Sequence, residues 1–146
     1  MAGNGAHRGM NDYRWTDLPS LAESSDPHAL VQLMLDGAVA RVLQAQGALE
    51  NGDTPLKCEL IGKALNLVEG LRACLDEIRG GEIAGNLAAL YDYMAVRLVA
   101  ANAFGDVAIL REVASLLREI QTGWREMGEL LAIDRERSHP AAEAAR

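Results

Sequence analysis

Apolar residues recur at steps of three and four positions along four long segments of this chain, and short turns separate the segments. This spacing is the period of a helix that buries one face. The segments span about residues 27–50, 54–79, 82–104 and 107–131. Because short turns force consecutive helices to lie antiparallel, the sequence predicts an all-α, antiparallel up-and-down four-helix bundle, preceded by a short N-terminal arm or helix.

Start and stop signals mark the ends of these helices. Asp26 can accept a hydrogen bond from an unpaired amide of the first turn, and Pro27 suits the first helical position because it lacks an N–H. Thr54-Pro55 repeats this start signal, and Asp106 is placed to cap the fourth helix. The predicted stops of the first three helices are Asn51-Gly52-Asp53, Gly80-Gly81 and Gly105.

The chain divides into three regions on these signals. Residues 1–24 carry scattered apolar groups interrupted by Pro19 and are expected to form a mobile N-terminal arm. Residues 25–132 form the helical bundle. Residues 133–146 mix charges with alanine, contain Pro140 and offer no apolar face, so we expect a disordered or frayed tail.

The composition limits the core and the partners. Apolar residues make up 49% of the chain and aromatic residues only 4%, so the core must be mainly aliphatic. A net charge of −7 repels phosphate backbones and anionic lipids, which predicts no nucleic-acid partner. No stretch approaches the ~18 uninterrupted apolar residues of a membrane span. We therefore expect no membrane insertion and a cytoplasmic location.

The side chains that carry catalysis or bind metals are scattered. His7, His28 and His139 form no cluster with metal-ligand spacing, and no inward-facing Glu-x-x-His pair occurs. Cys58 and Cys74 have no histidine within a helical turn to activate them, and a straight helix holds them about 24 Å apart, too far for a disulfide. No glycine-rich phosphate motif is present. We expect neither an enzyme nor a cofactor.

Apolar coverage is broader than one core face on two of the helices. This breadth indicates a groove beside the core that could receive an amphipathic helix from a partner. The residues that widen the faces are Leu33, Leu35, Val39 and Leu43 in the first helix and Leu90, Tyr91, Tyr93 and Met94 in the third.

Several glycines fall inside the predicted helices, where each costs up to about 1 kcal/mol relative to alanine. One interpretation is that some allow close helix contact and the others are tolerated losses. The other is that a looser bundle adjusts its grooves around a partner. The glycines are Gly37, Gly47, Gly62, Gly70, Gly85, Gly123 and Gly128.

The start of the third helix carries a dense pattern that resembles the signature of the flagellar secretion (export) chaperone family FliS. Supporting pieces occur before and after it, so that the resemblance covers about residues 26–131. Leu35 departs from the aromatic residue that the family usually has before Asp-Gly. The matching residues are Gly80-Gly81-Glu82-Ile83-Ala84, Asn86-Leu87, Leu90-Tyr91-Asp92-Tyr93-Met94, Arg97-Leu98 and Ala101-Asn102, with Pro27-His28, Leu30, Asp36-Gly37-Ala38, Gly52-Asp53 and Trp124.

The resemblance implies a cytosolic chaperone that binds the disordered C-terminal segment of flagellin. Such a protein prevents premature polymerisation and delivers flagellin to the flagellar type III export gate. Free protein would self-associate weakly through its exposed groove. An alternative of a different class is a helical adaptor or regulator that binds another export-apparatus or regulatory protein, and it shares the same composition.

Tyr13 resembles an N-terminal tyrosine that family members use near the flagellin groove and in gate recognition, and Met10 matches the apolar residue before it. In one interpretation the arm covers the groove when flagellin is absent. In the other it is a disordered end that carries aromatic residues by chance. Asn86, Tyr91 and Asn102 either contact the partner or fix helix register through hydrogen bonds. The residues expected to bind the partner are Met10, Tyr13, Leu30, Val31, Met34, Asp36, Leu90, Tyr91, Tyr93, Met94 and Leu98.

Overall fold

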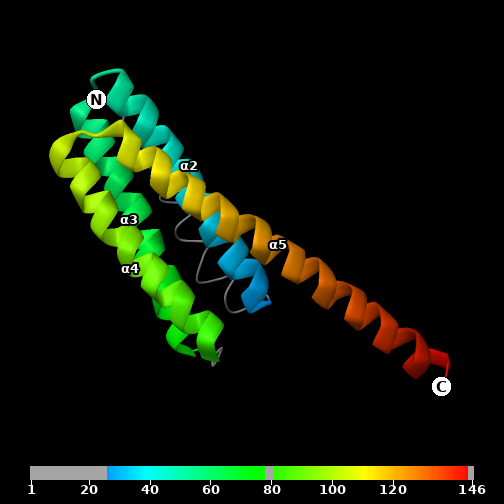
Figure 1. The fold of residues 1–146 in the computed structure, drawn as a ribbon. Helices are drawn as coiled ribbons and strands as arrows, with labels where there is room; N and C mark the ends of the chain where they lie inside the picture. Colours follow the sequence, from blue (N-terminus) through cyan, green and yellow to red (C-terminus); the bar gives the residue numbers. More distant parts are fainter. Residues whose placement is uncertain (1–25, 78–80, 145–146) are drawn as a thin grey trace. The chain divides into compact units, whose positions relative to one another are not determined.

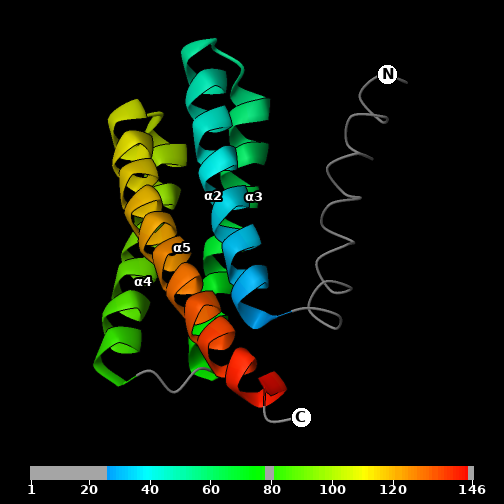
Figure 2. The same ribbon diagram turned by 90° about the vertical axis from the view of Figure 1, so that its right-hand side faces the viewer.

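A computed structural model of the protein describes residues 26–77 and 81–144, with side chains described for 26–75 and 81–138. These residues form four helices and no strand (Figures 1 and 2). The chain divides into two units, residues 1–31 and 32–146, and the helix contacts that define the bundle lie within the second. The helices are α2 Pro27–Glu50, α3 Thr54–Glu77, α4 Gly81–Phe104 and α5 Val107–Ala144.

Two glycines sit where α2 and α3 approach each other closely. A Cβ atom at Gly37 would lie 3.3 Å from Leu67 Cδ1, and one at Gly70 would lie 2.6 Å from Met34 Cε. These two positions therefore favour glycine because a larger residue would push the helices or side chains apart. The same contacts show that α2 and α3 run antiparallel. A Cβ would meet only open space at Gly47, Gly62, Gly85 and Gly123.

Polar pairs join α2 to α5. Gln121 Nε2 donates a hydrogen bond of 2.7 Å to Asp36 Oδ1, and Arg111 Nη2 lies 3.8 Å from Glu50 Oε1. The later residue on α2 pairs with the earlier residue on α5, so these two helices are also antiparallel. Since α3 also contacts α4 and α4 contacts α5, the predicted up-and-down four-helix bundle is confirmed.

Lys57 links the start of α3 to the end of α4. It is buried, and its Nζ donates a hydrogen bond of 2.9 Å to the main-chain oxygen of Asn102 in the last turn of α4. That carbonyl belongs to the set that a helix leaves without an internal partner at its C-terminus, where a cation is also favoured by the helix dipole.

Replacing Lys57 by methionine should therefore lower the free energy of unfolding by about 1–3 kcal/mol, because the Asn102 carbonyl loses its donor in a part-buried environment. Lys63→Met is the matched control, since Lys63 makes only a 4.0 Å pair with Glu59 on its own helix and should change stability by less than about 0.5 kcal/mol. Urea unfolding of the two variants measures the difference. Equal stabilities would contradict the role of Lys57.

The core is aliphatic, as the composition predicts. All four helices contribute side chains that are less than 2% exposed, and Tyr91 is the aromatic residue among the buried ones at 3%. The largest fully buried side chains are Leu35 and Val42 from α2, Val68 and Leu71 from α3, Met94 and Leu98 from α4, and Leu110, Val113 and Leu117 from α5.

The turn between α2 and α3 confirms one predicted signal and corrects another. Gly52 has a φ of 73°, and the amide of Asp53 donates to Ala48 O at 2.9 Å, which closes α2 in a Schellman motif. Asp53 Oδ1 then accepts from the amide of Leu56 at 3.2 Å. The cap of α3 is thus Asp53, one residue before the expected Thr54, because Thr54 already lies in the helix.

The other start signals are confirmed. Asp26 Oδ1 accepts a hydrogen bond of 3.0 Å from the amide of His28, and Asp106 Oδ1 accepts one of 2.9 Å from the amide of Ala108. Gly105, with a φ of 61°, ends α4 as predicted.

The helix α5 continues to Ala144, past the expected bundle end at residue 132. Residues 129–138 are all exposed, so this part of α5 buries no face. A segment without an apolar face can still be helical, because alanine, glutamate and arginine are strong helix formers by themselves. Fraying of residues 133–146 stays a prediction, and the arm at 1–24 lies outside the described residues.

Candidate partner-binding surface

An exposed apolar strip runs along the outer face of α4. It consists of Ala89, Tyr93, Val96, Val99, Ala103 and Phe104, which we call the α4 strip. Val96 is 68% exposed, Val99 56% and Phe104 80%. The opposite face of α4 supplies Tyr91, Met94, Leu98 and Ala101 to the core. The helix is therefore apolar on two sides, and only one of them packs against the described residues.

A row of exposed apolar side chains along one helix favours a site for another protein. Single exposed apolar side chains are normal on a soluble protein, whereas a contiguous row of them along one helix indicates an interaction surface. Steps of three and four residues place these side chains on one side of the helix. The α4 strip thus has the shape of one half of a helix-packing interface.

A carboxylate on α5 fixes the edge of the α4 strip. Glu112 Oε2 accepts a hydrogen bond of 2.9 Å from the Tyr93 hydroxyl, and Glu112 Oε1 accepts one of 2.8 Å from Arg97 Nε. Hydrogen bonds from Arg97 and then Tyr93 lower the pKa of Glu112, and the bond to Glu112 raises the pKa of Tyr93. The phenol stays protonated and its ring, 43% exposed, is held beside the strip.

This network predicts a pH dependence of stability. Because the pKa of Glu112 is lowered by folding, its contribution is present above about pH 4.3, the usual pKa of glutamate, and is lost as the pH falls through the lowered value. The melting temperature of Glu112→Gln should therefore lie below that of the unmodified protein at neutral pH and approach it as the pH falls below about 4.3. A difference that is constant across this range would contradict the assignment. Thermal unfolding followed at several pH values measures it.

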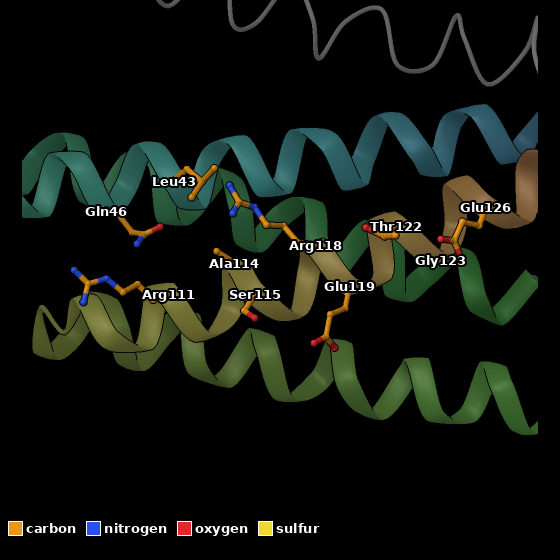
Figure 3. Close-up of a pocket in the computed structure, with 10 residues that line it drawn as sticks. All are labelled: Leu43, Gln46, Arg111, Ala114, Ser115, Arg118, Glu119, Thr122, Gly123 and Glu126. Atoms are coloured by element: carbon orange, nitrogen blue, oxygen red, sulfur yellow. The ribbon is translucent and has the colours of Figure 1, made fainter.

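A second feature is an open groove of about 720 Å³ between α2 and α5 (Figure 3). Leu43 and Ala114 supply apolar lining, and arginines and glutamates stand along α5. The full lining is Leu43 and Gln46 from α2 and Arg111, Ala114, Ser115, Arg118, Glu119, Thr122, Gly123 and Glu126 from α5.

The structure separates the α4 residues that were expected to bind a partner. Met94 and Leu98 are 0% exposed and Tyr91 is 3% exposed, so in this state they pack inside the bundle and offer no surface. Burial also raises the pKa of Tyr91 to about 12. Leu90 is half-buried. Tyr93 alone of this group lies on the α4 strip.

The expected residues of α2 are also divided. Val31 and Met34 are buried, at 7% and 9%, and Leu30 is half-buried. Asp36 is exposed and accepts hydrogen bonds from Gln121 and, at 3.0 Å, from Gln32. Met10 and Tyr13 lie outside the described residues.

The side chains expected to widen the α2 face divide in the same way. Leu33 and Leu43 are 40% and 38% exposed, whereas Leu35 and Val39 are buried. Of these four side chains, only Leu33 and Leu43 are exposed enough to contact a partner.

Val96, Val99 and Phe104 are not among the residues that the sequence predicts to bind a partner. A signal was present, because these residues follow Tyr93 at steps that make a second apolar row on the helix, beside the row that contains Met94 and Leu98.

Asn86 and Asn102 were expected either to contact the partner or to fix helix register through hydrogen bonds. Asn102 contributes its main-chain oxygen to Lys57, while its side-chain Oδ1 is buried without a hydrogen-bond partner. Asn86 is exposed. Cys58 is exposed and Cys74 is half-buried, and neither forms a disulfide in the part of the chain that the structure describes.

Among the described residues, no group of three or more histidine, cysteine, aspartate or glutamate side chains is arranged to hold a metal ion. No helix in the part of the chain that the structure describes has the length and apolar character needed to cross a membrane.

A helical bundle with an open apolar strip and a groove defines a protein-binding module. Comparison with known proteins identifies its kind: the model of the flagellar protein FliS family matches residues 9–130, and the chain belongs to this family. It is 44% identical over 119 residues to flagellar secretion chaperone FliSB of Pseudomonas aeruginosa. The match covers 82% of this chain and 94% of that protein.

Other relatives agree. Flagellar secretion chaperone FliS of Salmonella typhimurium is 40% identical over 120 residues, covering 82% of this chain and 89% of the relative. The Vibrio cholerae protein of the same name is 36% identical over 118 residues, and the match covers 81% of this chain and 87% of the relative. The resemblance seen in the sequence is confirmed, and the named members of the family are chaperones rather than enzymes.

Proposed function

We propose that this protein is a cytoplasmic flagellar export chaperone that binds the disordered C-terminal segment of flagellin. Bound flagellin is kept from polymerising prematurely and is delivered to the flagellar type III export gate. The observation that carries the proposal is the α4 strip, an uncovered apolar face on a chain that belongs to the flagellar protein FliS family.

The chemistry of the strip suits this task. An unfolded segment whose apolar residues recur with a helical period gains a buried face when it folds against Val96, Val99 and Phe104. Each apolar side chain that becomes fully buried contributes about 1.5–3 kcal/mol. That gain offsets the entropy cost of ordering the segment, so binding needs no nucleotide hydrolysis.

Two other parts of the proposal concern the free protein and the gate. Without flagellin, the exposed strip supports weak self-association. The N-terminal arm, with Met10 and Tyr13, covers the groove until flagellin arrives and takes part in gate recognition. Sedimentation of the free protein over a range of concentrations tests the self-association.

Removal of residues 1–20 tests the role of the arm. In this variant the flagellin on-rate should rise, and capture of the purified gate protein should fall.

Calorimetric titration with the C-terminal segment of flagellin from the same organism tests the central claim. We expect one-to-one binding with a large negative heat capacity change, the signature of apolar burial. Absence of binding by the full chain would overturn the proposal and favour the adaptor or regulator, whose partner is another export-apparatus or regulatory protein.

A further inference from the structure

The groove between α2 and α5 contains an arginine without a partner. Figure 3 shows the Arg118 side chain reaching from α5 toward α2, beside Leu43. Within the described part of the chain, no hydrogen bond or ion pair engages Arg118. In contrast, Arg97 and Arg72 on neighbouring helices bind Glu112 and Asp92 directly. The Arg118 guanidinium therefore keeps all its donors available at the groove.

Other polar groups add to this site. Arg111 lines the groove two helical turns before Arg118, about 10 Å along the axis, and makes only the loose 3.8 Å pair with Glu50. Opposite them on α2, Gln46 Oε1 is buried and accepts no hydrogen bond from the described residues. A buried carbonyl oxygen of this kind favours a ligand that brings an N–H donor.

The acidic residues of the lining do not neutralise this end of the groove. Glu119 points away from α2 in Figure 3, and Glu126 lies two turns beyond Arg118 toward the other end. The groove is thus cationic near Arg111 and Arg118, on a chain whose overall net charge is −7. That overall charge disfavours a phosphate backbone as the occupant.

We propose that this groove binds a carboxylate-bearing stretch of the flagellin C-terminal segment, with Arg118 as its anchor. The inference rests on the proposed function and names the chemistry of one part of the partner. Aspartate or glutamate carboxylates accept paired hydrogen bonds from the planar guanidinium. An apolar residue next to them packs on Leu43 and Ala114, and a main-chain N–H of the segment donates to Gln46 Oε1.

The repeat of α5 supplies a matched control. Arg-Glu recurs at 111–112, 118–119 and 125–126, so Arg125 stands one heptad after Arg118. Arg125 is exposed and does not line the groove. Arg118→Gln and Arg125→Gln therefore remove the same charge from the same helix, and only the first removes it from the groove.

The experiment titrates the full chain and these two variants with the flagellin segment and with a copy whose aspartates and glutamates are changed to asparagine and glutamine. We expect Arg118→Gln to weaken binding of the unmodified segment about tenfold, which corresponds to about 1.4 kcal/mol, and Arg125→Gln to leave it unchanged. The neutral copy should bind the full chain less tightly than the unmodified segment does. Its affinities for the full chain and for Arg118→Gln should be equal.

The outcomes separate the two proposals. If the full chain binds the segment but Arg118→Gln and Arg125→Gln weaken it equally, the groove assignment is wrong and the proposed function stands. The groove assignment is also wrong if Arg118→Gln and the neutral copy each lower the affinity by the same factor alone and in combination. Independent effects of this kind mean that no carboxylate of the segment contacts Arg118. If the full chain does not bind the segment at all, both proposals fail.

Discussion

Changing Val96 and Val99 together to glutamate is expected to weaken binding of the flagellin segment by about 100-fold or more while leaving the free chaperone folded. Both side chains are more than half exposed on the α4 strip, so glutamate at either position keeps its charge in water in the free protein. In the complex the same charges would lie under the apolar face of the bound segment, where burial of an unpaired carboxylate is strongly unfavourable.

The size of the effect follows from two contributions. Burying a valine contributes about 1.5 kcal/mol or more, and losing two such contributions already corresponds to about 100-fold in affinity. Glutamate is also a better helix former than valine, so α4 itself is not weakened. Calorimetry gives the affinity, and thermal unfolding of the free protein shows whether stability is kept.

The control adds the same charge elsewhere. Asn66 and Ala73 are exposed on α3, and a variant with glutamate at both positions has the same net charge as the strip variant. It should bind the flagellin segment with nearly unchanged affinity. Equal losses in the two variants would mean that net repulsion, and not the α4 strip, governs binding.

The sequence predicts the helices and their order because the signals are local. Asp26 and Asp106 cap the helices that follow them, and Gly52 and Gly105 take the positive φ that ends the helices before them. Each of these depends only on a few neighbouring residues. The four apolar rows and the short turns then leave one simple arrangement.

The sequence cannot predict which apolar row of α4 faces the core. Met94 and Leu98 belong to one row and Val96 and Val99 to another, and both rows repeat with the period of the helix. The choice depends on the surfaces that α3 and α5 present, which is a property of the whole bundle. Leu33 and Leu35 on α2 pose the same problem, since one is 40% exposed and the other fully buried.

The arginine that faces the groove is also not predictable from the sequence. Arg111, Arg118 and Arg125 occupy equivalent positions in the α5 repeat, yet Arg125 is not part of the groove lining. Which of them lines the groove depends on the packing of whole helices, which no local pattern encodes.

Leu98→Ala and Val99→Ala, adjacent on α4, should have opposite consequences. Leu98 is 0% exposed, so its truncation leaves a cavity among the side chains of the core. Such a change costs about 2–5 kcal/mol, enough to lower the melting temperature by roughly 10 °C in a domain of this size. Val99 is 56% exposed, and replacing it with alanine, a better helix former, should change stability by less than about 0.5 kcal/mol.

The affinities should follow the reverse order. Val99→Ala removes the equivalent of two methylene groups from the α4 strip, at about 0.8 kcal/mol each, and should weaken flagellin binding about tenfold. Leu98→Ala should bind nearly as well as the unmodified protein at temperatures well below its transition, because its folded form keeps the strip. If Leu98→Ala instead lost affinity without losing stability, Leu98 would be a contact residue, and flagellin binding would have to open the bundle.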